Sequence, residues 1–293
     1  MMSKAKVLRD LLAKDVCYAM PCCYDALSAK LIEQEGYPFT FMSGFAASAS
    51  RIGAPDLGLM SYGEVLDQAR NIADAISIPM IADGDTGYGN AMNVRRSVLG
   101  FARAGCASVM IEDQVAPKRC GHTPGKAVVP REEAYDRIRA AADARAVLRE
   151  TGEDILILAR TDARHEHGLG EAIARAERFA ELGADILFVE APRSEVEMRE
   201  VCAELPGAKM ANLLEGGLTP QLPLATLQDI GFSLAAYPLS LMAAAMEAMV
   251  TALRALRQDQ HPGQMDFKEM RQRIGFNDYY ETSSAYDSAK RED

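Results

Sequence analysis

The chain has no surplus of positive charge. Its 293 residues carry 32 Lys and Arg against 42 Asp and Glu, which gives a net charge of −10. It also has no Lys/Arg block, no zinc-knuckle spacing and no aromatic RNA-binding box. Nonspecific binding to nucleic acid or to an anionic membrane needs a basic face, so we expect neither as a partner. The overall charge does not decide the charge of a pocket, so it does not exclude a local anion-binding site.

Segments typical of export and of membrane insertion are also missing. Residues 1–15 are charged and amphipathic, unlike a signal peptide. The most apolar stretch, residues 234–253, contains a proline, a serine and a glutamate, and predicts a buried strand, a turn and a packed helix. The six cysteines include the adjacent pair Cys22 and Cys23, which is not a disulfide framework. These features predict a cytoplasmic protein with reduced thiols.

Two common enzyme signatures are absent. There is no G-x-S-x-G elbow of a serine hydrolase and no G-x-G-x-x-G dinucleotide fingerprint. The chain has only four histidines, and of these only His122 lies among other reactive side chains. Hydrolysis by a Ser/His/Asp triad is therefore not expected.

Short apolar runs alternate with helical patterns along the chain. The runs are residues 16–20, 39–42, 78–82, 108–111, 155–159, 186–189, 209–211 and 232–236. Near-continuous apolar character suits parallel strands covered by helices. Eight such units in a chain of this length indicate an α/β fold, a (β/α)8 TIM-like barrel. A doubly wound open sheet is the alternative, which the number of units and the missing fingerprint disfavour.

The spacing of apolar residues predicts helices over residues 94–104, 131–151 and 169–182, each followed by a glycine that stops it. No break in composition occurs before the polar tail. We therefore expect a single domain over residues 1–293 with a C-terminal helical appendage from about residue 255. This aromatic and charged appendage could dock on a neighbouring subunit or pack on its own barrel.

Acidic residues follow two neighbouring strand candidates. Asp83 and Asp85 flank a glycine after the third run, and Glu112 ends the fourth. Barrel active sites gather at the C-terminal ends of strands, so these carboxylates should converge. Mg²⁺ prefers a few carboxylates plus water and substrate oxygens, and the three residues predict such a site. The alternative is a helix-cap or turn role for one of the aspartates.

A cysteine lies between cations and an imidazole in residues 118–122, Lys-Arg-Cys-Gly-His. Neighbouring positive charge favours the thiolate of Cys120. The run follows the fourth strand candidate and lies in a loop bearing Gly and Pro, so it predicts an acid/base group on a movable lid. The alternative is a surface turn with an incidental cysteine.

Two further strand ends offer groups that bind anions. Ser43-Gly44-Phe45 could present backbone N–H groups to a carboxylate, or it could be an ordinary turn. Arg160 ends the fifth apolar run and should reach the mouth of the pocket, where a guanidinium suits bidentate carboxylate binding. Its alternative role is a structural ion pair with Glu190 or Asp162.

Residues 118–122 match the lysine-(lysine or arginine)-Cys-Gly-His signature of isocitrate and 2-methylisocitrate lyases. The likeness runs from about Leu8 to at least Ala252. Its other motifs, in order, are Ser43-Gly44, Asp56, Asp83-Gly84-Asp85, Glu112-Asp113-Gln114, Ala159-Arg160-Thr161-Asp162-Ala163, Val189-Glu190-Ala191-Pro192 and Asn212. The chain therefore resembles the isocitrate lyase/phosphoenolpyruvate mutase superfamily, and within it the short 2-methylisocitrate and 2,3-dimethylmalate lyases.

The resemblance implies an α/β barrel whose last helix is swapped between subunits, usually in a homotetramer. It implies Mg²⁺, with Mn²⁺ as a substitute, held near Asp83, Asp85 and Glu112 largely through water. It makes Cys120 the general acid/base on a gating loop. The other catalytic residues implied are Lys118, Arg119, His122 and Arg160. The substrate-binding residues implied are Ser43, Gly44, Phe45, Asp56, Gly121, Arg160, Glu190 and Asn212.

The implied reaction is Mg-dependent carbon–carbon cleavage of a 2-hydroxy di- or tricarboxylate to pyruvate and a second acid. Phosphonomutase-type relatives generally lack the Cys motif. Methylisocitrate lyases usually follow Tyr-Pro-Leu-Ser closely with an Arg that holds a third carboxylate, whereas here residues 237–240 are followed by no Arg before Arg254. We therefore expect a substituted malate such as 2,3-dimethylmalate rather than 2-methylisocitrate. The alternatives are an oxaloacetate decarboxylase or hydrolase, a phosphonomutase-type enzyme, and a non-catalytic keto-acid-binding protein.

Overall fold

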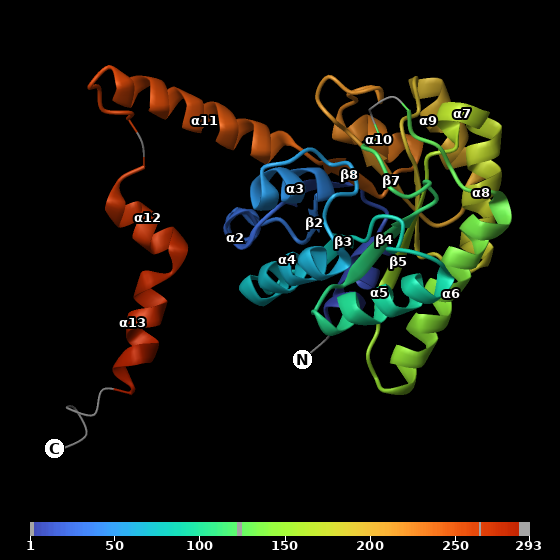
Figure 1. The fold of residues 1–293 in the computed structure, drawn as a ribbon, viewed down its shortest axis with the longest axis horizontal. Helices are drawn as coiled ribbons and strands as arrows, with labels where there is room; N and C mark the ends of the chain where they lie inside the picture. The colour runs from blue at the N-terminus through green and yellow to red at the C-terminus, as the bar shows by residue number, and fades with distance from the viewer. Residues whose placement is uncertain (1–2, 122–124, 264, 287–293) are drawn as a thin grey trace. The chain divides into compact units, whose positions relative to one another are not determined.

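The computed structural model describes residues 3–121, 125–263 and 265–286, and its main body is a closed barrel of eight parallel strands (Figure 1). The strands follow one another around the barrel in chain order. Their bounds are β1 (Tyr18–Cys23), β2 (Thr40–Met42), β3 (Met80–Asp83), β4 (Ser108–Glu112), β5 (Leu156–Thr161), β6 (Ile186–Val189), β7 (Ala208–Asn212) and β8 (Leu234–Tyr237).

The barrel closes where β1 pairs with β8, with Tyr18 opposite Leu234. Each of the eight predicted runs overlaps one strand, which confirms the (β/α)8 barrel and excludes the open sheet. The largest difference is in β1, which begins two residues later than predicted and continues through Cys23. Val16 is 41 % exposed and precedes the strand, so its apolar side chain is not part of the buried strand.

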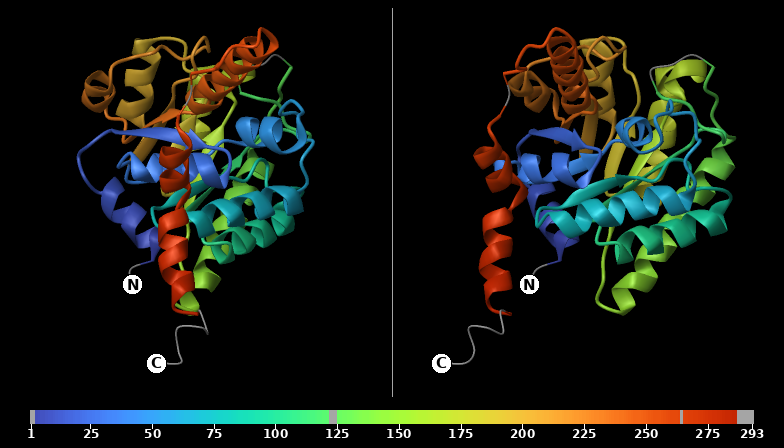
Figure 2. Two further views of the ribbon diagram at one scale, coloured as in Figure 1. Left: turned by 90° about the vertical axis from the view of Figure 1, so that its left-hand side faces the viewer. Right: turned by 60° about the vertical axis from the view of Figure 1, so that its left-hand side comes forward.

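The helices between consecutive strands lie on the outside of the barrel, as both views in Figure 2 show. The helices of the chain are α1 (Lys4–Leu12), α2 (Ala26–Gln34), α3 (Gly44–Ile52), α4 (Tyr62–Ala75), α5 (Ala91–Arg103), α6 (Arg131–Glu150), α7 (Arg164–His167), α8 (Leu169–Glu181), α9 (Glu195–Glu204), α10 (Leu224–Ile230), α11 (Ser240–Arg257), α12 (Phe267–Ile274) and α13 (Phe276–Ser284).

The three helices predicted from apolar spacing are α5, α6 and α8, and each ends at most one residue from the predicted end. The glycines that follow them, Gly105, Gly152 and Gly183, have φ values of +86°, +81° and +102°. A residue without a side chain adopts this left-handed conformation at little cost, which explains why the helices stop there.

Buried apolar side chains fill the barrel interior and form a second layer between strands and helices. The interior cluster includes Met20, Met110 and Phe188, which alternate along their strands with residues that face the helices. Ala5 and Leu8 of α1 belong to the same interior cluster, and Leu8 is fully buried. Helix α1, at the start of the chain, therefore packs against the side chains of the barrel interior.

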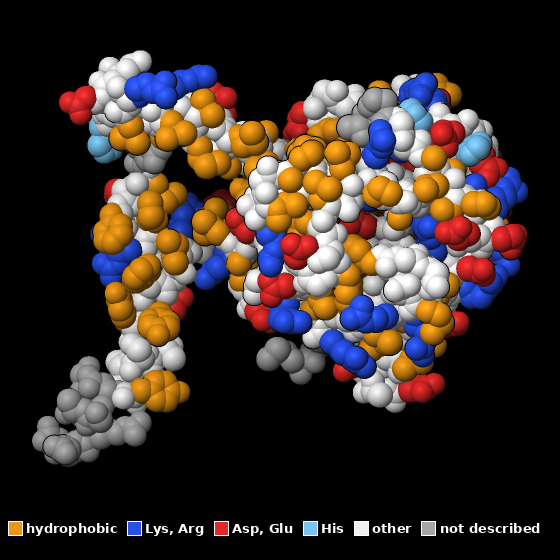
Figure 3. All heavy atoms as spheres, in the orientation of Figure 1, with side chains coloured by type: hydrophobic (Ala, Val, Ile, Leu, Met, Phe, Trp, Pro, Cys, Tyr) orange, Lys and Arg blue, Asp and Glu red, His pale blue; other side chains and the backbone are white. Residues whose placement is uncertain are grey.

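The chain divides into two compact units, residues 1–242 and 243–293. The described part of the second unit comprises most of α11 together with α12 and α13. In this unit Arg271 lies 5.3–5.8 Å from three aromatic ring centroids, and many apolar side chains are exposed (Figure 3). They are Met246, Met249, Val250, Leu253, Leu256, Met265, Phe267, Met270, Ile274, Phe276, Tyr279, Tyr280 and Tyr286. No described helix combines the length and apolarity that a membrane crossing requires.

Candidate active site at the carboxyl ends of the strands

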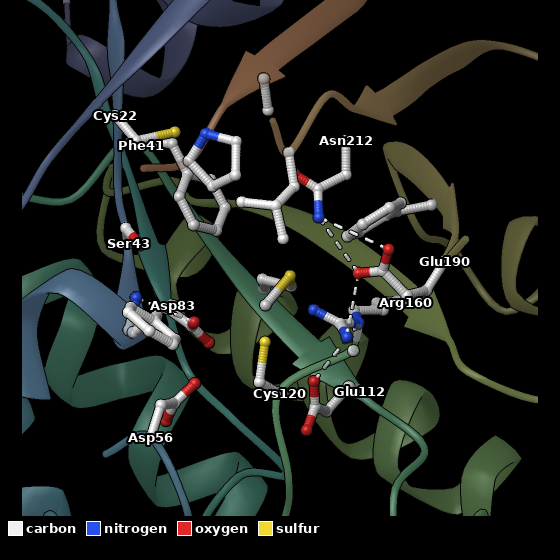
Figure 4. Close-up of a pocket in the computed structure, with 18 of the residues that line it drawn as sticks. Cys22, Phe41, Ser43, Asp56, Asp83, Glu112, Cys120, Arg160, Glu190 and Asn212 are labelled. Atoms are coloured by element: carbon white, nitrogen blue, oxygen red, sulfur yellow. Dashed lines mark hydrogen bonds and ion pairs between the residues drawn. The ribbon is translucent and has the colours of Figure 1, made fainter. Parts of the chain in front are cut away.

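A pocket opens where the carboxyl ends of the barrel strands meet (Figure 4). It contains about 610 Å³ of empty space, part of it open to solvent. Among the described residues its lining includes four acids and three cations: Asp56, Asp83, Glu112, Glu190, Lys118, Arg119 and Arg160. A dicarboxylate entering this pocket would add to its negative charge, so binding needs either a further cation or protonated acids.

Asp83 ends β3 and is held by two backbone N–H groups. Gly44 N donates to its Oδ2 at 3.2 Å, and Asp85 N donates to its Oδ1 at 3.0 Å. Burial raises the pKa of Asp83 to about 6, although the nearby ammonium of Lys118 acts in the opposite direction. A Cβ at Gly44 would lie 2.4 Å from Asp83 Oδ2, so this contact requires glycine at the start of α3.

The chain turns sharply after Asp83 and places Asp85 at the same end of the barrel. Gly84 N donates to Met110 O at 3.0 Å, and a Cβ at Gly84 would lie 2.5 Å from that oxygen. Glu112 N donates to Asp85 O at 2.9 Å, which ties the turn to β4. Because Gly84 has no side chain, the backbone approaches β4 closely and brings two acidic strand ends together.

Lys118 pairs with two of the carboxylates. Its Nζ lies 2.7 Å from Asp56 Oδ1 and 2.8 Å from Asp85 Oδ1, and 6 % of its side chain is exposed. Burial alone would lower the pKa of Lys118, but the charges of Asp85, Asp83 and Asp56 raise it well above its usual range. Lys118 is thus a fixed positive charge at the acidic end of the pocket.

Glu112 is a buried carboxylate with one unpaired oxygen. Its Oε2 lies 3.4 Å from Arg160 Nε, whereas its Oε1 has no hydrogen-bond partner among the residues that the structure describes. Burial raises the pKa of Glu112 well above its usual range, against the opposing charge of Arg160. A buried carboxylate oxygen without a partner is a place for a cation or for the water that a cation carries.

The donor set fits a magnesium ion held through water. In the described part of the chain, no three Asp, Glu, His or Cys side chains converge as direct ligands of one ion. Mg²⁺ dehydrates reluctantly, and it usually keeps several waters beside one or two carboxylates. Asp83, Asp85 and the unpaired oxygen of Glu112 supply hard oxygen donors for such an ion.

Arg160 lies among three acids, and its guanidinium also lines the pocket. Its Nε and Nη2 lie 2.8 and 3.0 Å from the two Asp162 oxygens, and Nη2 lies 3.0 Å from Glu190 Oε2. Burial alone would lower the pKa of Arg160, but Asp162, Glu190 and Glu112 raise it well above its usual range. The ion-pair interpretation of Arg160 thus describes its contacts, and these pairs still leave it facing the cavity (Figure 4).

Cys120 and Gly121 both line the pocket, and Cys120 is half-buried. Figure 4 shows the Cys120 side chain pointing into the cavity between Asp83 and Arg160. A Cβ at Gly121 would lie 2.3 Å from Arg160 Nη2 and 2.6 Å from Glu190 Oε2, so the backbone here packs directly on the Arg160–Glu190 pair. The loop therefore places a thiol at the pocket because glycine permits this close approach.

The Ser43-Gly44-Phe45 segment is the start of α3 and lines the pocket. Ser43 caps the helix by accepting a hydrogen bond from Ala46 N at 3.3 Å, and Ser43 N donates to Cys23 O at 2.9 Å. With Gly44 N donating to Asp83, two of the three N–H groups expected to bind an anion are paired within the chain. The positive end of the α3 helix still faces the pocket.

On the opposite side of the pocket, Asn212 Nδ2 lies 3.3 Å from Glu190 Oε2. Beyond this pair the lining is mostly apolar and comes from several strand ends and the loops after β7 and β8. The apolar lining residues are Cys22, Phe41, Phe45, Met110, Phe188, Met210, Leu214, Ala236, Pro238 and Leu239. The pocket therefore has an acidic end and an apolar wall.

The pocket brings together almost all of the residues predicted from the sequence. Asp85 lies beside it, in contact with Lys118, and His122 lies outside the described residues. Sequence reasoning missed Lys126 and gave Asp162 no role except as a structural partner of Arg160. It included Gln114 only as part of a motif. A charged residue that is buried at a loop gives no local sequence signal, because its burial depends on partners distant in the chain.

The fold and the pocket define a class: a (β/α)8 barrel whose carboxyl-end pocket combines clustered carboxylates, a guanidinium and a loop cysteine. Residues 8–257 match the family profile described as phosphoenolpyruvate phosphomutase. The chain belongs to this family, within the phosphoenolpyruvate mutase/isocitrate lyase superfamily. The resemblance inferred from the motifs is confirmed.

Curated relatives with lyase names match over most of the chain. A 2,3-dimethylmalate lyase of Eubacterium barkeri is 41 % identical over 258 residues, 88 % of this chain and 88 % of the relative. A 2-methylisocitrate lyase of Escherichia coli is 39 % identical over 258 residues, 88 % of this chain and 86 % of the relative. At this level of identity over most of the chain, the protein is an enzyme of a family that includes lyases.

Solved structures show the same fold. A crystal structure of 2,3-dimethylmalate lyase superposes with a TM-score of 0.92 at 34 % identity, covering 99 % of this chain and 97 % of that chain. Oxaloacetate acetylhydrolase in complex with 3,3-difluorooxalacetate also gives 0.92 at 34 % identity, with 97 % of each chain covered. A phosphonopyruvate hydrolase complex with oxalate and Mg²⁺ gives 0.83 at 28 % identity, covering 97 % of this chain and 99 % of that chain.

Proposed function

We propose that the protein is a Mg-dependent lyase that cleaves a substituted malate, such as 2,3-dimethylmalate, to pyruvate and a second carboxylic acid. The observation that carries the proposal is the position of Cys120. Its side chain points into a pocket between acidic residues and Arg160, opposite an apolar wall. The lyase names of the relatives support the same reaction class.

In the proposed reaction a base, either a pocket carboxylate or water, takes the proton of the substrate's 2-hydroxyl group, and the bond between C2 and C3 breaks. The hydroxyl carbon becomes the keto carbon of pyruvate, and the electron pair of the broken bond stays on C3. The Cys120 thiol gives its proton to C3 and completes the second acid. Arg160, held beside the pocket by Asp162 and Glu190, offsets the negative charge that develops during cleavage.

Asp83, Asp85 and Glu112 would hold Mg²⁺, or Mn²⁺ in its place, largely through water. When bound, the ion supplies Lewis-acid stabilisation of negative charge on substrate oxygens. Lys118 is paired with Asp56 and Asp85 and places a positive charge beside these carboxylates. Asn212 and the helix start at Gly44 would orient the carboxylate groups of the substrate.

The apolar wall supports a dicarboxylate substrate with alkyl substituents. Leu214, Pro238 and Leu239 line the pocket, and Ser240 makes a hydrogen bond with Glu215. No Lys or Arg occurs between the Tyr-Pro-Leu-Ser segment and Arg254, so no neighbouring cation is placed to pair with a third carboxylate. A methyl group of a malate would instead be buried against these side chains, a gain of about 0.8 kcal/mol for each buried methylene-sized group.

A second candidate reaction is hydrolysis of oxaloacetate to oxalate and acetate. It is favoured by the likeness to oxaloacetate acetylhydrolase over 97 % of each chain. In that reaction water would attack the keto carbon, the same carbon–carbon bond would break, and the released methylene carbon would take a proton. Oxalate release distinguishes it from the malate cleavage.

The experiment is a comparison of substrates with Mg²⁺ present. Pyruvate release would be followed with lactate dehydrogenase for 2,3-dimethylmalate and 2-methylisocitrate, and oxalate release would be measured for oxaloacetate. We expect a clear preference for the methylated malate. A much higher kcat/KM for 2-methylisocitrate would contradict the proposed substrate, and activity on oxaloacetate alone would establish the second candidate.

We also propose that residues 1–293 act as one barrel domain with a C-terminal appendage from about residue 255, assembled as a cytoplasmic homotetramer with the last helix swapped between subunits. The exposed apolar side chains of α11, α12 and α13 support this, because exposed apolar surface of this kind marks association sites. Light scattering of the full chain should give four times the monomer mass. A monomer at micromolar concentration would contradict the proposal.

A further inference from the structure

Lys126 is a buried lysine in the loop between β4 and α6. Only 1 % of its side chain is exposed. A lysine at such depth loses the hydration of its ammonium group and needs partners that replace it. Lys126 does not line the pocket, so its charge is not available for direct contact with a substrate.

Among the described residues, the Lys126 ammonium has two partners, which belong to different parts of the site. It donates to the carbonyl oxygen of Gly121 and to Asp162 Oδ1, the latter at 3.0 Å. Gly121 directly follows Cys120 in the loop, whereas Asp162 directly follows β5. One buried charge therefore connects the segment that carries the thiol to the barrel wall.

Asp162 is shared between Lys126 and Arg160. Its Oδ1 accepts hydrogen bonds from Lys126 Nζ and from Arg160 Nη2, both at 3.0 Å, and its Oδ2 accepts from Arg160 Nε at 2.8 Å. Asp162 N donates to Asp113 Oδ1 at 2.9 Å, which fixes the backbone of this carboxylate. Lys126 thus helps to fix the carboxylate against which the guanidinium of Arg160 is oriented.

Gly121 packs against Arg160, the other cation that is paired with Asp162. A Cβ there would lie 2.3 Å from Arg160 Nη2, so the backbone of the loop contacts the guanidinium directly. The Gly121 carbonyl meanwhile accepts from Lys126. Both contacts hold Gly121, and with it the neighbouring Cys120, at the pocket; Lys126 makes one of them and supports the other through Asp162.

We propose that Lys126 is a positioning residue, which holds the Cys120–Gly121 backbone against the pocket and fixes Asp162 as the support of Arg160. The role of Cys120 in this inference rests on the proposed function. The placement of the thiol by Lys126 does not depend on the proposed function, and this placement can be measured without any substrate.

The test is the variant Lys126→Met, which keeps most of the side-chain volume and removes the ammonium. Cys120 should then react with iodoacetamide several-fold faster, measured on its own peptide by mass spectrometry, while the half-buried Cys202 keeps its rate as an internal reference. The kcat for the malate substrate should fall roughly 10- to 100-fold with a smaller change in KM, because the reacting groups are misplaced. Lys14→Met, at an exposed lysine, should change neither quantity.

An unchanged Cys120 alkylation rate in folded Lys126→Met protein would overturn the proposal, whatever the activity. If the Met variant does not fold, Lys126→Gln provides the same test with an N–H donor retained and the charge removed. If the wild-type protein cleaves none of the substrates but the variant exposes Cys120, the proposed reaction fails and the positioning role stands.

Discussion

The side-chain amide of Gln114 binds both backbone groups of Arg119: Oε1 accepts from Arg119 N, and Nε2 donates to Arg119 O, each at 2.9 Å. Gln114 is 1 % exposed and lies just after β4. It therefore fixes the residue next to the proposed acid Cys120 to the rigid end of a barrel strand. Because this buried side chain bonds both the N–H and the C=O of one loop residue, it restricts the backbone conformation of the loop.

Replacing Gln114 by Leu should release this loop. The N–H and C=O groups of Arg119 would lose their partners, and because Arg119 is exposed the loop would move so that water can replace them. We expect kcat/KM to fall roughly 10-fold or more, with faster proteolysis between residues 115 and 130. Gln258→Leu, at an exposed position, is the control. Wild-type kinetics in Gln114→Leu would show that the hydrogen bonds between Gln114 and Arg119 have no functional role.

Gly121→Ala should be nearly inactive. The added Cβ would meet Arg160 Nη2 at 2.3 Å and Glu190 Oε2 at 2.6 Å, so either the loop or the ion pair must move. A displacement of this size near the reacting groups can cost about 100-fold in kcat/KM. The matched control is Gly170→Ala in α8, where nothing lies within 4 Å of the added atom. Equal activity of the two variants would contradict the packing of Gly121 on Arg160 during turnover.

Cys120→Ser should reduce kcat by roughly 100-fold or more, the usual scale of general acid catalysis, because a hydroxyl is a much weaker acid than a thiol. Binding of oxalate with Mg²⁺, measured by calorimetry, should change little, since the two side chains are similar in size. Cys202→Ser serves as the control thiol. Full lyase activity in Cys120→Ser would remove the assigned role of Cys120 as the proton donor.

Asp83 should make the metal-free protein less stable as the pH rises from about 4 to about 6. Burial raises the pKa of Asp83 in the folded state to about 6, above its unfolded value, so the unfolded chain gives up its proton first. Stability is therefore greatest below the unfolded pKa and is lost up to the folded pKa. Urea unfolding in EDTA should show that Asp83→Asn lacks this loss. A wild-type-minus-variant difference that does not vary with pH would contradict the buried state of this carboxyl.

Leu239→Arg should shift the substrate preference. The new guanidinium would stand at the apolar wall, where it can pair with a third carboxylate. We expect kcat/KM to fall for 2,3-dimethylmalate and to rise relative to it for 2-methylisocitrate. Val196→Arg, on the exposed side of α9, controls for added charge. A preference that stays the same would show that Leu239 does not face the substituents of the substrate.

Much of the fold could be predicted because its signals are local. Buried parallel strands require apolar runs, and the helices between them require apolar residues at helical spacing, so both patterns are visible along the chain. The carboxylates Asp83, Asp85 and Glu112 could be grouped once the barrel was inferred, because all parallel strands end on the same side. Their grouping follows from topology without knowledge of any side-chain contact.

The contacts that define the site could not be predicted in the same way. For Arg160 the sequence leaves two roles open, binding a substrate carboxylate or an ion pair with Glu190 or Asp162, and the structure shows that it pairs with both acids. The sequence also gave no sign that Gly44 N is paired with Asp83. Each of these contacts joins different strand ends or loops, so distance along the chain says nothing about it.

The sequence by itself determined the barrel, its family and the set of reactive residues, since hydrophobic periodicity and short motifs are properties of neighbouring residues. The tertiary structure decided which charges are paired. Lys126 is a loop cation in the sequence, and in the fold it is a buried ammonium between Gly121 and Asp162. Burial removes water from a charge, so its partners, and with them its role, depend on the packing of segments that are distant in the chain.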